Sequence, residues 1–225
     1  MGRIFEKKHS KTAIDIRVYM LTIYNEDENR YQLVQEPDPS TSYTYADYLQ
    51  WNFRERLELI GGHIFKMSPA PATKHQVATG NLFSSLHTFL KKKKCKAFVA
   101  PFDVRLPIKN RKKDNEVTTV VQPDICVICD ETKIDERGCC GAPDLVIEIL
   151  SPGNSSHEVN TKFALYEEAG VKEYWLINPV EENLVVFILN NEGKFSGTKM
   201  YAGGDVLYSS AITGFKIKVS EIFSK

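Results

Sequence analysis

The chain has 225 residues, of which 42% are hydrophobic and 26% are charged, and its 29 basic residues balance its 29 acidic ones. This composition is typical of a globular protein and excludes a disordered or fibrous chain. The apolar stretches are too short to cross a bilayer, which takes about 18 residues. The basic start is also not followed by the apolar core of a secretory signal. We therefore expect a globular protein of the cytoplasm that has no membrane partner.

The first 40 residues are expected to form an N-terminal extension that is partly flexible, because they mix runs of charge with one β-like patch at 17–24. The domain proper is expected to cover 41–225. It starts with a capping-box pattern at 44–47, which predicts the start of a helix. Residues 56–68 then have β character around Gly61-Gly62, a dipeptide typical of a hairpin turn.

The middle of the chain shows one helical pattern followed by strand patterns. Apolar residues at every fourth position predict an amphipathic helix over 75–92. Strict alternation over 98–106 predicts one half-buried strand. Short β-branched runs at 120–129 and 145–150 are typical of interior strands.

The last third contains a second helix and further strands. The helix is predicted over 158–169 and ends at Gly170, and strands are predicted over 172–178 and 184–189. The remainder is expected to form β-hairpins. The order helix, strand, strand, strand, helix, strand predicts an α/β (α+β) protein with a mixed sheet and added β-hairpins.

Opposite charges are segregated along the chain. Residues 91–113 contain ten bases and one acid, whereas residues 114–150 contain nine acids and two bases. One block of each sign can bind a polyanion and also hold cations. The alternative is a pair of solvated loops of opposite charge.

The five cysteines point to reduced thiols, because their number is odd and no secretion signal precedes them. Cys126 and Cys129 have the CxxC spacing of some zinc sites, but a strand would send them to opposite faces. The adjacent pair Cys139-Cys140 also fits a tetrahedral ion poorly. We expect buried free thiols rather than a zinc site.

Three acids lie within apolar strand patterns, at Asp124, Asp144 and Glu148, while the usual phosphate-loop, Rossmann, serine-hydrolase and zincin motifs are absent from the sequence. A carboxylate inside a strand is costly unless it is paired or binds a cation. The alternative for any one of them is a buried salt bridge.

The spacing of these acids indicates which of them act together. Asp144 and Glu148 are about 13 Å apart along a strand, which is too far to hold one ion. Glu148 therefore needs a partner from a neighbouring strand, and Asp124 is the candidate. Hard oxygen ligands suit Mg²⁺ or Mn²⁺, and such an ion near a lysine-rich block favours phosphodiester hydrolysis.

Three further residues are candidates for the same site. Lys162 lies on a helical stripe with Glu158 and Tyr166 and can reach over the strand end, although an i,i+4 ion pair with Glu158 is the alternative. His75 opens the long helix, where a role as a cap or a surface residue is the alternative. Glu58 is a weaker candidate of the same kind.

A series of segments carries a resemblance to a known family. They are ELIGG at 58–62, MSP at 67–69, His75, QPD at 122–124, GAPDLVIEILSP at 141–152, Lys162, Tyr166 and GVKEYWLINP at 170–179. At this spacing the series resembles the Uma family of predicted restriction endonucleases, of the PD-(D/E)xK nuclease superfamily. The resemblance covers about 41–223, nearly all of the chain beyond the N-terminal extension.

The resemblance implies a restriction endonuclease-like core with the helix at 75–92 packed on the sheet. It places Asp124 at the PD position and Glu148 at the (D/E) position. The position of the usual lysine is Leu150, and Lys162 from the following helix is the implied migrated replacement.

The remaining matches extend this expectation. Glu58 and His75 match family positions and are expected to line the same pocket. Glu158 stands where the family often has Asp.

Together these expectations describe a Mg²⁺- or Mn²⁺-dependent DNA endonuclease. Asp124 and Glu148 would bind the ion, Lys162 would act on the water and the phosphate, and Glu58 and His75 would be auxiliary.

DNA would also be contacted outside this pocket, and the protein would pair with a second copy. The lysines of the basic block, Lys91, Lys92, Lys93 and Lys94, would contact DNA phosphates rather than bases. We expect a two-fold homodimer, with the apolar strand at 183–190 as interface surface. One alternative is a catalytically silent module that binds nucleic acid or protein on the same fold. The other is a hydrolase of a different phosphodiester.

Overall fold

The structure is a computed structural model of the chain. It describes residues 21–25, 30–34, 41–51, 56–67, 72–107, 113–151 and 156–224. Contacts divide it into two units, Met1–Asp38 and Pro39–Lys225. In the first unit, β1 (Leu21–Asn25) and β2 (Arg30–Val34) form an antiparallel hairpin. The rest of the predicted extension, including 17–20 of its β-like patch, lies outside the described residues.

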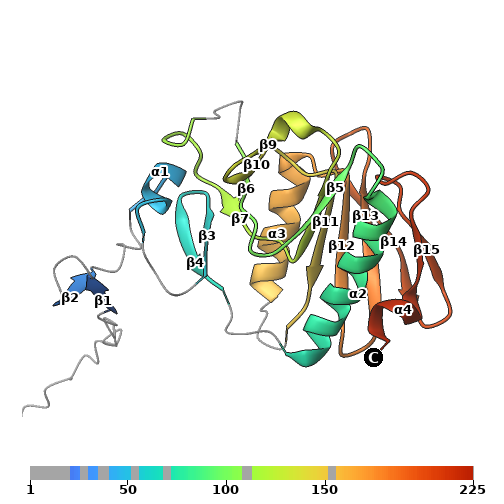
Figure 1. Ribbon diagram of the computed structural model, residues 1–225. Helices are drawn as coiled ribbons and strands as arrows, with labels where there is room; N and C mark the ends of the chain where they lie inside the picture. The colour runs from blue at the N-terminus through green and yellow to red at the C-terminus, as the bar shows by residue number, and fades with distance from the viewer. Residues whose placement is uncertain are drawn as a thin grey trace, which may run out of the picture. The chain divides into compact units, whose positions relative to one another are not determined.

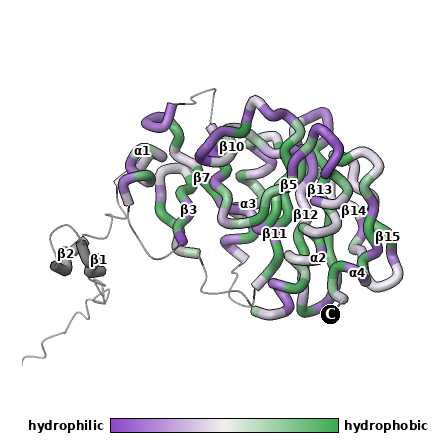
Figure 2. The backbone as a smooth tube through the Cα atoms, in the orientation of Figure 1, coloured by the Kyte–Doolittle hydropathy of each residue, from purple (hydrophilic) through white to green (hydrophobic). Residues whose placement is uncertain are grey.

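The second unit contains a six-stranded mixed sheet with the order β14-β13-β12-β11-β8-β5. The parallel pair β11–β12 lies in its middle, and the other neighbours are antiparallel. The strands are β5 (Lys96–Val99), β8 (Ile125–Ile128), β11 (Leu145–Ile149), β12 (Glu173–Asn178), β13 (Asn183–Leu189) and β14 (Phe195–Ala202). Figure 2 shows hydrophobic colouring through its central strands.

Helices cover both faces of this sheet. α2 (Thr73–Leu90) buries one residue per turn, from Ala78 to Leu90, in a core with the odd-numbered residues of β8 and β11. The short α4 (Val219–Phe223) lies against α2. α3 (Ser156–Ala169) packs against the opposite face through Tyr166. The order α2, β5, β8, β11, α3, β12 confirms the α/β fold with a mixed sheet that the sequence predicts (Figure 1).

A second sheet lies on the α3 side, with the order β4-β3-β7-β6-β10-β9. Its strands are β3 (Leu57–Ile60), β4 (His63–Lys66), β6 (Val104–Arg105), β7 (Val120–Val121), β9 (Ile134–Asp135) and β10 (Gly138–Cys140). Side chains of β6 and β7 join those of α3 and of the first sheet in one apolar cluster. α3 is therefore held between the two sheets, as Figure 1 shows.

Smaller elements complete the unit. α1 (Tyr45–Tyr48) starts at the predicted capping box, in which Thr44 and Asp47 bond each other reciprocally. The β3–β4 turn has positive φ at both Gly61 and Gly62, as a two-residue hairpin of this type requires. β15 (Val206–Tyr208) and β16 (Lys216–Lys218) form a further hairpin. Within the described residues, no helix is long and apolar enough to cross a membrane.

Two strand predictions are wrong in an instructive way. The run at 98–106 is not one strand but β5 followed by β6, and the run at 120–129 is β7 followed by β8. Each run leaves one sheet and enters the other, and each break contains a proline, Pro101 or Pro123, which has no N–H for a strand ladder. Both runs cross beside Asp124, whose carbonyl oxygen accepts from the Ala100 N–H at 3.1 Å.

The prediction that all cysteines are free is also wrong. Cys95 and Cys129 form a disulfide, because the β5–β8 register that pairs Lys96 with Ile128 sets them side by side at the next position. Cys126 packs in the cluster on the α3 face and Cys129 against the cluster on the α2 face, so the CxxC pair is split between faces as expected.

Candidate active site

Asp124 and Glu148 converge from adjacent antiparallel strands. The register pairs Ile125 of β8 with Ile147 of β11, so the next position brings Asp124 opposite Glu148. Directly opposed residues point to the same face of a sheet. The Ile149 N–H also donates to Asp124 Oδ2 at 2.8 Å, which fixes the carboxylate against the end of β11. The two acids line one pocket, as the sequence predicts.

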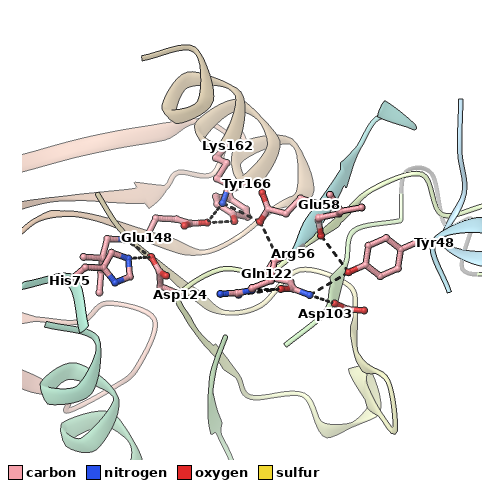
Figure 3. A network of polar contacts seen from close by, with 12 residues as sticks. Tyr48, Arg56, Glu58, His75, Asp103, Gln122, Asp124, Glu148, Lys162 and Tyr166 are labelled. Carbon is pink, nitrogen blue, oxygen red and sulfur yellow. Dashed lines mark hydrogen bonds and ion pairs between the residues drawn. The ribbon is translucent and has the colours of Figure 1, made fainter. Parts of the chain in front are cut away.

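Lys162 joins this pair to the second sheet (Figure 3). Its ammonium group lies 3.0 Å from Glu148 Oε1 and 3.1 Å from Glu58 Oε1, and Glu58 comes from β3. All three side chains are at most 12% exposed. The Glu58 carboxylate is fixed in turn by the backbone N–H of Gln122, at 2.9 Å. Lys162 therefore bridges acids of two different sheets rather than forming only the local pair with Glu158 considered above.

Burial and charge shift the protonation equilibria of this cluster. Burial raises the pKa of Glu148, the Lys162 charge opposes this shift and the Asp124 charge adds to it, and together they set the pKa at about 7. For Lys162, burial alone would lower the pKa, but the carboxylates of Glu148 and Glu58 outweigh burial and hold it above its ordinary value. Lys162 is thus a permanent cation beside an acid whose pKa lies near neutral pH. Perturbed groups in a pocket are typical of functional sites.

Tyr166 is a second hydrogen-bond donor to Glu148. It follows Lys162 by four residues on α3, and its hydroxyl group donates a hydrogen bond to Glu148 Oε1 at 2.6 Å. Burial, and then the Glu148 charge, raise the pKa of Tyr166 well above its usual value, so it stays a neutral donor. The sequence places Tyr166 on the stripe of Lys162, but its contact with Glu148 depends on tertiary packing that the spacing does not reveal.

His75 is buried in the first turn of α2 and contacts Asp124. Its Nε2 lies 3.2 Å from Asp124 Oδ2, and its Nδ1 lies 3.3 Å from Thr79 Oγ1. The residue at the N-cap of α2 is Ala72, which makes no side-chain cap. His75 is therefore neither a cap nor a surface residue, and it lines the pocket with the acids.

The donor set suits a hard cation in part. In the contacts among the described residues, each carboxylate is held through one oxygen, Oδ2 in Asp124 and Oε1 in Glu148, and the second oxygen of each takes no part in them. Among the described residues, no group of three or more His, Cys, Asp or Glu side chains is arranged to hold a metal by itself. Mg²⁺ usually binds through one or two carboxylates and keeps several waters, so two acids are a fitting protein share.

The third interior acid and the basic block lie elsewhere. Asp144 precedes β11 at the end away from Glu148, and it accepts from the Cys129 N–H and from the Lys172 ammonium group. Lys91–Lys94 follow the C-terminal end of α2 and are exposed. They start 16 residues after His75, about 24 Å along a helix. Their contact with DNA phosphates stays a prediction, and positions 108–112 of the basic block lie outside the described residues.

Two residues of the pocket region have no role in the prediction from sequence. Arg56 lines the pocket, and Gln122 lies behind it with its amide and backbone both hydrogen-bonded. Leu150 also lines the pocket, next to Glu148. The pocket wall is therefore apolar at the position where the resemblance described above leads one to expect a lysine.

Comparisons with known proteins agree with this geometry. The crystal structure of a "putative nuclease belonging to DUF820" from Anabaena variabilis superposes with a TM-score of 0.63 at 22% identity, over 80% of this chain and 97% of that one. This likeness shows the restriction endonuclease-like fold. An uncharacterized protein of Synechocystis sp., slr1290, is 25% identical over 158 residues, which are 69% of this chain and 78% of that protein. The Uma2 family model, described as "Putative restriction endonuclease", matches residues 45–220. The chain therefore belongs to the Uma2 family of nucleases.

Proposed function

We propose that this protein is a Mg²⁺-dependent DNA endonuclease in which Lys162 replaces the lysine usually found at position 150. One observation carries the proposal: the Lys162 ammonium group lies 3.0 Å from Glu148 in the pocket that Asp124 also lines. A buried lysine held between acids is costly to fold, so its place in an open pocket favours a role in chemistry.

The chemistry divides between an ion and the side chains. Asp124 and Glu148 would hold Mg²⁺ or Mn²⁺, which when bound neutralises charge on the phosphate and lowers the pKa of the attacking water. Lys162 would place a fixed positive charge where the phosphate oxygens gain negative charge. Glu58 orients Lys162 from the side of the second sheet, and His75 orients the Asp124 carboxylate.

Supercoiled plasmid tests the proposal most directly. We expect relaxation and linearisation with Mg²⁺ or Mn²⁺, and none with EDTA or with Asp124→Ala. Lys162→Met should abolish most of the cleavage, whereas Lys194→Met serves as a matched control, because Lys194 is an exposed lysine paired with Glu167. Cleavage that persists in Asp124→Ala would contradict the proposed site.

A binding assay separates the enzyme from a silent module. Fluorescence anisotropy with a labelled 20-bp duplex in EDTA measures affinity without cleavage. Binding without any metal-dependent cleavage of plasmid would favour the catalytically silent alternative.

We also propose that the protein acts as a two-fold homodimer, since cutting both strands of a duplex favours such an assembly. The apolar strand suggested for the interface, β13, pairs with neighbours on both sides, so its backbone edges are not open. Exposed apolar side chains lie instead on the edge strand β14 and on β15, at Met200, Val206 and Tyr208. Sedimentation equilibrium of the native chain and of Met200→Lys would test this surface, and a monomer at micromolar concentration would contradict the dimer.

A further inference from the structure

Arg56 lies at the pocket without a part in the proposed chemistry. It directly precedes β3, and its carbonyl oxygen accepts from the Met67 N–H at 3.0 Å, which fixes its backbone at the open end of the β3–β4 hairpin. Arg56 is exposed to solvent, and it lines the same pocket as Asp124, Glu148 and Lys162.

The guanidinium group of Arg56 is held from one side. Its Nε and Nη2 both donate to the side-chain oxygen of Gln122, at 3.2 and 3.1 Å. The amide nitrogen of Gln122 donates to Asp103 Oδ1 at 2.8 Å. Because an ionised carboxylate only accepts, Asp103 sets the orientation of the amide and keeps its oxygen toward Arg56.

Gln122 is itself an anchored residue. Its side chain is buried, its amide nitrogen also lies 3.3 Å from the Tyr48 hydroxyl, and its backbone N–H bonds Glu58. The same residue thus holds Arg56 through its side chain and the partner of Lys162 through its backbone (Figure 3). An arginine held in this way loses less freedom when it binds a ligand.

The two cations of the pocket differ in how their charge is balanced. Lys162 lies against two carboxylates, whereas the contacts of Arg56 within the described residues are to a neutral amide. Arg56 therefore keeps its unit charge toward the pocket. Two of the five N–H donors of its guanidinium group bond Gln122. The remaining N–H donors of this planar group have the spacing that suits two oxygens of a phosphate.

We propose that Arg56 binds a phosphate of the nucleic-acid backbone at the pocket and that Gln122 is its positioning residue. The inference rests on the proposed nuclease function and adds the group that holds the substrate there. It differs from the predicted contacts of Lys91–Lys94, which are point charges at the far end of α2 and would bind DNA without aligning it for cleavage.

Variants of Arg56 test the phosphate contact by two independent readouts. Arg56→Gln should lower kcat/KM for duplex cleavage at least tenfold and should reduce the slope of log Kd against log salt by about one, because one phosphate contact is lost. The slope is measured in EDTA with a labelled 20-bp duplex, so it does not depend on cleavage. Arg56→Lys should restore the slope but not the full kcat/KM, since lysine keeps the positive charge and lacks the planar set of donors that binds two oxygens at once.

Arg137→Gln is the matched control. Arg137 is an exposed arginine whose guanidinium group pairs with Asp114 at 2.6 Å, and it does not line the pocket. We expect its variant to match wild type in both readouts.

Gln122→Met tests the positioning role. It should lower kcat/KM while leaving the salt slope unchanged, because the Arg56 charge remains. In the Arg56→Gln background it should cost nothing further, an outcome that a purely structural role would not produce.

The outcomes separate this inference from the proposed function. If wild-type protein cleaves the duplex and Arg56→Gln matches it in kcat/KM and slope, the phosphate assignment is wrong and the nuclease proposal stands. If wild-type protein neither binds nor cleaves, both fall.

Discussion

The two ends of β11 each present a largely buried acid and a lysine, yet they are built differently. At one end Asp144 is bonded by Lys172, whose side chain is 68% exposed, and by the backbone N–H of Cys129. At the other end Glu148 is bonded by Lys162, whose side chain is 8% exposed. Water therefore reaches the Lys172 side chain freely, whereas the protein encloses that of Lys162. Residue types alone therefore do not distinguish a structural acid from a site acid, whereas the burial of the partner does.

The largest contrast is expected when each lysine is removed. Lys162→Met leaves Glu58 and Glu148 buried without their cation, which should cost about 3–5 kcal/mol of unfolding free energy. We expect plasmid cleavage to fall by about 100- to 1,000-fold as well. Lys172→Met should cost less than about 1 kcal/mol and leave cleavage unchanged. Urea unfolding and initial cleavage rates measure both, and equal losses in the two variants would contradict the contrast.

The disulfide should affect only the Asp144 end. Cys129 carries the N–H that bonds Asp144, and its disulfide with Cys95 closes a separation of 34 residues. Reduction, or the double variant Cys95→Ala/Cys129→Ala, should lower the unfolding free energy by about 2–4 kcal/mol. Cleavage by protein that remains folded should be unaffected. A mass increase of two hydrogens on reduction would establish the bond, and a loss of cleavage in the folded variant would show that the two ends are coupled.

Asp144→Asn weakens the structural end without removing its shape. The bond from the Cys129 N–H becomes a neutral one and the bond from Lys172 loses its anionic acceptor, at a cost of about 1–3 kcal/mol. Cleavage per folded molecule should stay at the wild-type level. Glu148→Gln is the matched change at the other end, and it should abolish cleavage. If Asp144→Asn abolished cleavage too, the assignment of Asp144 to structure would be wrong.

The smallest expected effect is a gain. In the Lys162→Met background, Leu150→Lys places an ammonium group on the pocket wall beside Glu148, where Leu150 now lies. We expect about a tenfold recovery of the cleavage rate, equal to about 1.4 kcal/mol in the barrier. Leu150→Met in the same background controls for the change in packing and should recover nothing.

Much of the fold follows from periodicity, and the errors arise where the chain changes sheets. The helices α2 and α3 and the strands β11 and β12 repeat patterns that a local window detects. The alternation over 98–106 continues across Pro101, because Phe98 of β5 and Val104 of β6 both pack in the apolar cluster on the α3 side. The pattern therefore cannot show that the two strands belong to different sheets. The prolines were visible in the sequence and were the signal for the breaks.

The acids of the site could be predicted from the sequence, whereas the residues that position its other side chains could not. Asp124 and Glu148 stand out because acids in apolar strands demand a partner, and their convergence agrees with the prediction. The placement of Arg56 depends on Gln122, 66 residues away in the chain, and on Asp103 behind it. No local pattern encodes such a contact, because each of these residues is ordinary in its own segment.

The contacts of Lys162 also determine at what stage of folding the pocket is formed. The position of its ammonium group depends on Glu58 of β3, on Glu148 of β11 and on the placement of α3. Three segments spread over 104 residues must therefore pack together before the group is in place. A growing or partly folded chain contains all the right side chains but not their arrangement. The pocket is therefore complete only once all three segments have been synthesised and folded together.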